Sequence, residues 1–420
     1  MYSITPQRTS HRQARRTVVA VATLALLLAV FGSQSSAYAQ LNGGRGPVVV
    51  RSAWNLEPGY LTLYGQMRLY GKVVQVPKIG GTTGATLWDV QGAASLNLGI
   101  SRHFEASIAP VIYQDSHKGA GADEFNLPDN MLLRLKIADF GQRGGSMKYG
   151  VELGSRIPLG KAHNIPFEQY SAKRVGFGFT LLGSYARDPL YPEDGISVHF
   201  NAGYWNHNDV GVQLLENDPT NELGLVTQMT QEFSYGAAVV FPSDRFDFRF
   251  ELFGTSFLKT PPPAAYSQEP VSYFSPGVTY KPYRWMNLNF SGDLRISGNV
   301  DNTNYGLGKL PIFPSNVPNY PSWRVNIGAK LTLLPTSLYS VSERDLLMQK
   351  AESRRELFEQ IIKEQRETES AEAELERIKE ERRKAERELE RLRQILEGEA
   401  RRQQQDQSYQ SSNGSQPQPQ

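Results

Sequence analysis

Charged side chains occupy alternate positions of apolar runs through most of the chain, and their spacing could do chemistry. Charges away from bulk water are tolerated only when hydrated or paired, so a row of them on one face indicates an aqueous passage or an ion-pair network. The set holds ten bases, seven acids and one histidine. These pore-lining candidates are Arg68, Lys72, Asp89, Glu105, Arg134, Lys136, Lys148, Glu152, Arg156, His199, Glu232, Asp247, Arg249, Glu251, Asp293, Arg295, Arg324 and Lys330.

Catalytic and metal chemistry have little support in the sequence. The chain has no cysteine, which excludes thiolate ligands and thiol nucleophiles, and its six histidines are scattered. His199 and Asn201 share a face, and a serine would complete a hydrolytic set, but no matching motif is present. A hydrogen-bonded interior histidine explains His199 more simply. We therefore predict no catalytic residue, no cofactor and no metal, and no enzyme activity, with a hydrolase as the minor alternative.

Twelve runs between residues 59 and 334 place apolar and polar residues on opposite faces. In the first run, Leu61, Leu63 and Met67 alternate with polar residues such as Arg68. A period of two is typical of a β-strand with one apolar face. Runs of about 12 residues exceed the usual strand of a soluble sheet and are long enough to cross a bilayer at a tilt.

The lengths of the connections between these runs alternate along the chain. They are roughly 12, 3, 17, 7, 16, 9, 25, 4, 17, 4 and 26 residues. Outer-membrane barrels have short periplasmic turns and long outer loops. We therefore predict an all-β transmembrane antiparallel up-and-down barrel of about 12 strands over residues 59–334. An even number of strands places both termini in the periplasm.

The N-terminus has the features of an export signal. A region with four arginines precedes an apolar stretch at 17–31, and an A-x-A cleavage site ends at Ala39. Residues 1–39 are therefore predicted to be a signal peptide, and residues 40–58 a periplasmic lead-in. Loss of the four arginines changes the formal net charge from +2 to about −2, which gives no reason to expect nucleic acid as a partner.

The last run and the lead-in carry a family resemblance. Residues 326–333 read Asn-Ile-Gly-Ala-Lys-Leu-Thr-Leu, which resembles the signal by which outer-membrane barrels are inserted, and residues 51–59 are similar to the lead-in of barrels of the transporter type. The chain thus resembles a Gram-negative outer-membrane β-barrel of the porin-like or small-solute transporter type. The resemblance implies an outer-membrane location, contact with membrane lipid, and recognition of the last strand by the insertion machinery.

Two functions remain open for such a barrel. The inward charges favour a narrow porin-like channel or transporter for small solutes, with about three more bases than acids on its wall. The alternative is a non-conducting structural barrel, filled by paired charges, that anchors the segment following it.

A highly charged helix is predicted over residues 342–402, beginning where Asp345 follows Ser342 by three residues. At 1.5 Å per residue it would reach about 90 Å. One stripe has heptad spacing and could join a second copy or a periplasmic partner as a coiled coil; a solitary helix held by i,i+4 ion pairs is the alternative. Residues 403–420 are Gln/Ser/Pro-rich and predicted to be disordered. The seam is Leu375, Ile378, Ala385, Leu389, Leu392 and Leu396.

Overall fold

A computed structural model defines the fold and separates the chain into two units, Met1–Val341 and Ser342–Gln420. The predicted signal peptide lies outside the residues that the structure describes. These are residues 44–78, 81–118, 123–142, 144–215, 218–304, 318–339 and 343–412.

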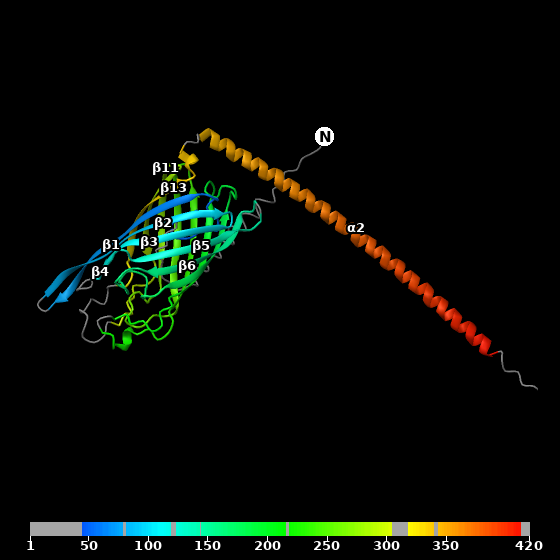
Figure 1. Ribbon diagram of the computed structural model, residues 1–420, viewed down its shortest axis with the longest axis horizontal. Helices are drawn as coiled ribbons and strands as arrows, with labels where there is room; N and C mark the ends of the chain where they lie inside the picture. The colour runs from blue at the N-terminus through cyan, green and yellow to red at the C-terminus, as the bar shows by residue number, and fades with distance from the viewer. Residues whose placement is uncertain are drawn as a thin grey trace, which may run out of the picture. The chain divides into compact units, whose positions relative to one another are not determined.

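The first unit is a closed antiparallel β-barrel (Figure 1). Neighbouring strands follow chain order, β13 pairs with β1, and β2 pairs with β3. Twelve of the described strands form the wall, as predicted, and the short β4 is added beside β3. The strands are β1 (Leu61–Lys78), β2 (Gly81–Ser101), β3 (Phe104–His117), β4 (Asp123–Asn126), β5 (Asn130–Phe140), β6 (Met147–Pro158), β7 (Gly176–Ala186), β8 (Ser197–Asn206), β9 (Gln231–Pro242), β10 (Phe246–Lys259), β11 (Val271–Tyr283), β12 (Met286–Arg295) and β13 (Trp323–Leu334).

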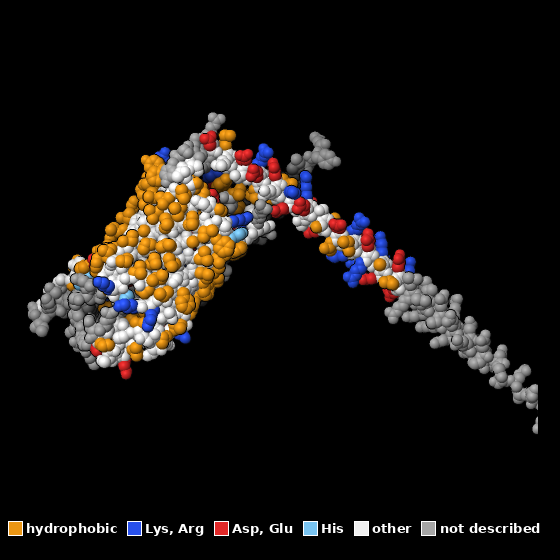
Figure 2. Space-filling model, viewed as in Figure 1, with side chains coloured by type: hydrophobic (Ala, Val, Ile, Leu, Met, Phe, Trp, Pro, Cys, Tyr) orange, Lys and Arg blue, Asp and Glu red, His pale blue; other side chains and the backbone are white. Residues whose placement is uncertain are grey.

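The two faces of the wall are inverted relative to a soluble protein. On β13, Val325 and Ile327 are exposed, whereas Arg324 and Asn326 are buried. Apolar side chains accordingly cover the visible outer surface of the barrel (Figure 2). Because the strand period is two, the alternation read in the sequence decides which residues face outward. An outward apolar surface around a polar interior is the pattern of a transmembrane β-barrel.

The connections divide the barrel into two ends. The short-turn end carries residues 102–103, 141–146, 187–196, 243–245 and 284–285. The long-loop end carries the connections from β3 to β5, β6 to β7, β8 to β9, β10 to β11 and β12 to β13, with a 3₁₀ turn at Glu222–Gly224. The predicted alternation of lengths therefore holds for every connection except the first.

The first connection was expected to be a loop of about 12 residues, but the strands continue through it. β1 and β2 stay paired out to Lys78 and Gly81, and in Figure 1 this blue hairpin extends past its neighbours. The extension contains three valines on β1 and three threonines on β2 (Val73, Val74, Val76, Thr82, Thr83 and Thr86), and such β-branched residues favour strands. One consequence is that Lys72, predicted to line the interior, lies on the extension and is exposed.

The second unit is one continuous helix, α2 (Glu343–Ser412), which follows a 3₁₀ turn at Thr336–Tyr339. Ion pairs one turn apart support it, such as Arg355–Glu359 at 3.0 Å and Arg382–Glu386 at 2.9 Å. The helix continues ten residues beyond the predicted end at 402, since the glutamines that follow are good helix formers. Residues 413–420 of the predicted disordered tail lie outside the described residues. Across the described chain, no helix combines the length and apolar character needed to cross a membrane.

Candidate functional site in the barrel lumen

Residues 44–58, here called the N-terminal segment, lie inside the barrel. The backbone N–H groups of Val48, Val49 and Val50 donate to the carboxylate of Glu251 on β10, at 3.1, 2.8 and 2.8 Å. Val50 lies directly over Gly236 of β9, where an added Cβ would stand 2.9 Å from the valine side chain. The N-terminal segment is therefore held by an acidic side chain of the inner wall, Glu251, and packs closely against a glycine, Gly236.

Other wall side chains hold the rest of the N-terminal segment. The N–H of Arg51 donates to Asn201 Oδ1 at 2.6 Å, and the N–H of Ala53 donates to Ser184 Oγ at 2.8 Å. Near the C-terminal end of the segment, the N–H of Leu56 donates to Glu105 Oε2 at 2.7 Å. These contacts come from different strands at the short-turn half of the barrel, so the segment is attached by side chains and not as an added strand.

This position differs from the periplasmic lead-in predicted for residues 40–58. The physical reason is that the inward polar side chains, which were expected to face water, satisfy the backbone of the segment instead. The Arg51 guanidinium also forms an ion pair with Glu152 on β6. No local periodicity marks such contacts, and the apolar run Val48-Val49-Val50 is the one local sign that this segment is buried.

A second insertion comes from the long-loop end. The 159–175 loop places Phe167 against Tyr70, with ring centroids 5.3 Å apart. Its next residue, Glu168, forms an ion pair with Arg68, and Gln169 Nε2 donates to Glu232 at 2.8–2.9 Å. Phe167 adopts a φ of 67°, an uncommon left-handed conformation for a bulky residue. Burial of its ring compensates for that conformation.

Most of the predicted pore-lining residues share this interior. Four are away from it or less enclosed: Lys72 is exposed, and Asp247, Arg295 and Lys330 are partly buried. Arg134 has a side chain that is 7% exposed. The fully buried members are Arg68, Asp89, Glu105, Lys136, Lys148, Glu152, Arg156, His199, Glu232, Arg249, Glu251, Asp293 and Arg324.

The buried charges are extensively paired with one another. Lys136 lies 2.9 Å from Glu105, and Lys148 lies 3.2 Å from Asp139. Two further pairs join neighbours on the inner face, with separations of 3.3 and 3.4 Å: Arg249–Glu251 and Arg324–Asp293. Pairing lowers the cost of removing these charges from water. The charged side chains of the inner wall therefore form a network of ion pairs and not a row of separate charges.

His199 is enclosed between two hydroxyl groups. Its Nδ1 lies 2.8 Å from Ser184 Oγ and its Nε2 lies 3.1 Å from Ser197 Oγ, and the residue is 2% exposed. Ser184 also accepts the N–H of Ala53, so the N-terminal segment covers this group. The arrangement satisfies both ring nitrogens, as expected for an interior histidine. Within the described ranges, no group of three or more potential metal ligands is found.

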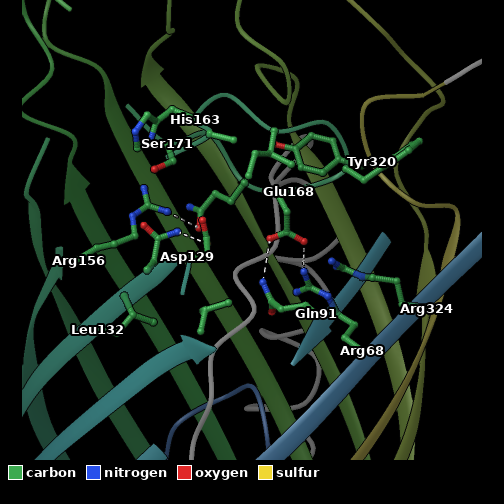
Figure 3. A pocket seen from close by; sticks show the side chains of 16 residues that line it. Arg68, Gln91, Asp129, Leu132, Arg156, His163, Glu168, Ser171, Tyr320 and Arg324 are labelled. Carbon is green, nitrogen blue, oxygen red and sulfur yellow. Dashed lines mark hydrogen bonds and ion pairs between the residues drawn. The ribbon is translucent and has the colours of Figure 1, made fainter. Parts of the chain in front are cut away.

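A cavity of about 50 Å³ adjoins the 159–175 loop (Figure 3). Its lining includes Arg68, Gln91, Glu168 and Arg324, together with Asp129 in the loop that precedes β5. Burial, followed by the nearby negative charge of Glu168, raises the pKa of Asp129 to about 6. A cavity of this size has room for a few water molecules at most. Among the described residues, this cavity therefore does not form a wide passage.

Comparisons with known proteins find likeness among solved structures alone. No family model matches the chain, and no curated protein matches it. An outer membrane channel from Pseudomonas putida F1 aligns with 10% identity and a TM-score of 0.42, over 68% of this chain and 100% of the other. The NanC porin aligns with 10% identity and a TM-score of 0.40, over 65% and 100%. The P. putida toluene transporter TodX aligns with 9% identity and a TM-score of 0.32, over 71% and 98%.

The strand order and the two faces define this chain as a transmembrane β-barrel whose lumen is occupied by its own N-terminal segment and by one of its own loops.

Proposed function

We propose that the protein is an outer-membrane channel for small polar solutes, closed in the conformation described. The observation that carries the proposal is the manner in which the N-terminal segment is held. Side-chain contacts such as those of Glu251 and Asn201 attach it to the wall, while the twelve strands close the barrel by pairing with one another. Withdrawal of the segment would leave a wall of polar and charged residues, which suits a water-filled passage.

The outward apolar surface supports a location in the outer membrane, in contact with lipid. We further propose that β13, which contains the sequence 326–333, is recognised by the insertion machinery, and that the short-turn end faces the periplasm with both termini. A protease added to intact cells should then cut within 207–230 and spare 243–245. Cleavage confined to the short turns would reverse this orientation.

Single-channel recording in planar bilayers tests the channel. We compare the wild type with variants that lack residues 44–56, that carry a shortened 159–175 loop, or that combine both changes. All retain the barrel strands, because β1 begins at Leu61 and the 159–175 loop lies between the end of β6 at Pro158 and the start of β7 at Gly176. Conductance should rise in each single variant and be largest in the combined one. A combined variant that folds and yet conducts nothing would refute the channel.

A second candidate is a non-conducting barrel that anchors the helix. The observation in its favour is that ion pairs and two inserted segments fill the lumen, while α2 is a single helix of 70 residues. On this view the fixed charges stabilise a plug, and function resides in α2. Absence of conductance in the folded combined variant described above would favour this candidate.

We also propose that α2 joins a second copy of the chain as a coiled coil. Leu375, Ile378 and Leu389 of the seam are 52–66% exposed in the single chain. Apolar residues at heptad spacing are buried when such helices associate. Residues flanking the seam, such as Glu388 and Arg393, have opposite charges that could pair between copies.

A further inference from the structure

Arg68 and Gln91 form a two-point grip on the carboxylate of Glu168 (Figure 3). The two wall residues are register partners on β1 and β2, so their side chains lie next to one another. The Arg68 guanidinium donates to Oε1 of Glu168, and the Gln91 amide donates to Oε2 at 3.3 Å. Each carboxylate oxygen thus has its own donor, an arrangement well suited to recognition of a carboxylate.

The grip is built from the wall and does not depend on the loop. Arg68 is 4% exposed and Gln91 is 6% exposed. The Gln91 amide also donates to Gln114 Oε1 at 2.8 Å, and Gln114 in turn donates to Asp89 Oδ1 at 2.8 Å. The second Asp89 oxygen lies 3.7 Å from Arg68 Nη2. This chain of contacts keeps both donors in position when Glu168 is absent.

Glu168 differs from its partners because a loop supplies it, 100 residues away from Arg68 in the sequence. If its carboxylate left without replacement, Arg68 would retain Asp89 at 3.7 Å as its acidic neighbour. A buried cation with a poor partner is costly. A ligand that brings its own carboxylate restores the same charge balance, whereas a neutral solute does not.

Two further observations indicate room for a ligand at this grip. The Nε atom of Arg68 is buried and has no hydrogen-bond partner in the described part of the chain. The cavity of about 50 Å³ lies beside the same residues, and departure of the Glu168 side chain would enlarge it. A spare donor and adjoining space are what an organic acid larger than the glutamate carboxylate itself would use.

We propose that Glu168 is an internal stand-in for the carboxylate of a solute, and that Arg68 and Gln91 bind small organic acids in its place. This inference rests on the proposed channel function and names its substrate class. An entering acid exchanges with Glu168, one carboxylate for another, and the 159–175 loop is released from the wall. The site therefore couples recognition of the solute to removal of the loop that obstructs the lumen.

Chemical complementation tests the binding site. In full-length protein in detergent, Glu168→Ala leaves the grip empty, and calorimetry should detect propionate binding but not binding of propionamide, its neutral analogue. The double variant E168A/R68Q should bind propionate at least tenfold more weakly. Glu193→Ala is the matched control, because Glu193 pairs with Arg45 elsewhere and its removal should create no propionate site. Absence of propionate binding to folded E168A would overturn the proposal.

Displacement in the wild type separates a solute site from a purely structural ion pair. Lys173 and Arg174 in the loop are exposed, and their cleavage by trypsin reports loop release. Because a tethered carboxylate competes at an effective concentration in the millimolar range, propionate is supplied at on the order of 100 mM and matched with sodium chloride. Cleavage should accelerate with propionate and not with propionamide.

The remaining outcomes are also decisive. If E168A binds propionate but the wild-type loop is never released, Glu168 is a structural residue and the proposal fails. Glu168→Gln is the second variant, since it keeps the side-chain size; its loop should be cut quickly with or without propionate. Neither measurement uses conductance. Failure of the channel would therefore leave propionate binding intact, whereas failure of the site would leave conductance intact.

Discussion

Replacing Glu251 by glutamine should loosen the N-terminal segment. The carboxylate accepts the N–H groups of Val48, Val49 and Val50, the last two on the same oxygen. Hydrogen bonds to a charged group contribute about 1.5–3 kcal/mol each. Glutamine removes the charge and leaves one acceptor oxygen, so at least one bond is lost and the others weaken. We expect a loss of about 2–4 kcal/mol, which corresponds to about a 30- to 1,000-fold larger population with the segment withdrawn.

The chain contains no cysteine, so a single Val49→Cys substitution reports this population by its rate of labelling with a maleimide. Labelling should be at least about 30-fold faster in the Glu251→Gln background, because the rate follows the open fraction when reclosing is fast. Asp247→Asn is the control: it lies on the same strand and pairs with Lys281 at 2.7 Å. Unchanged labelling in Glu251→Gln, or an equal increase in Asp247→Asn, would refute the reasoning.

Three further predictions concern the wall, the helix and pH. Leu135→Arg on the outer face should destabilise the barrel by about 2–4 kcal/mol, and Arg134→Gln by less; equal losses in urea unfolding would show that the faces are misassigned. The double substitution Leu389→Glu and Leu392→Glu should reduce oligomers of the full chain to monomers in sedimentation, and a wild-type monomer at all concentrations would remove the coiled coil. Since the pKa of Asp129 is raised from 3.8 to about 6, its protonated form favours folding, and this contribution is lost as pH rises through 6. The stability of the wild type relative to Asp129→Asn should therefore fall by about 1–3 kcal/mol between pH 4 and 7, and a flat difference would contradict the shift.

The sequence was most informative where structure depends on local periodicity. In residues such as Arg324, Val325, Asn326 and Ile327, the side-chain direction follows from position along the strand alone. The same rule assigned most of the inward charges, because a wall residue cannot change faces without a shift in register. Lys72 is the exception, because β1 continues beyond the closed wall and leaves the Lys72 side chain exposed and not inside the barrel.

The occupants of the lumen could not be found in this way. Arg51 and Glu168 lie in segments with no period, and their partners are about 100 residues distant in the chain. Such contacts form because the closed barrel brings distant parts of the chain together, and they leave no local pattern in the sequence. One signal was available: the wall carried seven acids beside its ten bases, so most of the bases could pair with an acid, which is less expected when charges line open water.

The location of the N-terminal segment has a consequence for how the barrel assembles. Val48 and Val50 belong to two apolar clusters, and the cluster of Val50 also contains Ala238, Phe253, Val271, Tyr273 and Tyr320. Closure of the wall joins β1 to β13, the first and last strands to be synthesised. The partners of the segment are spread around the wall, so its full set of contacts exists only once the sheet has curled. Residues 44–58 thus supply a core inside the barrel that is complete only when the last strand has closed the wall.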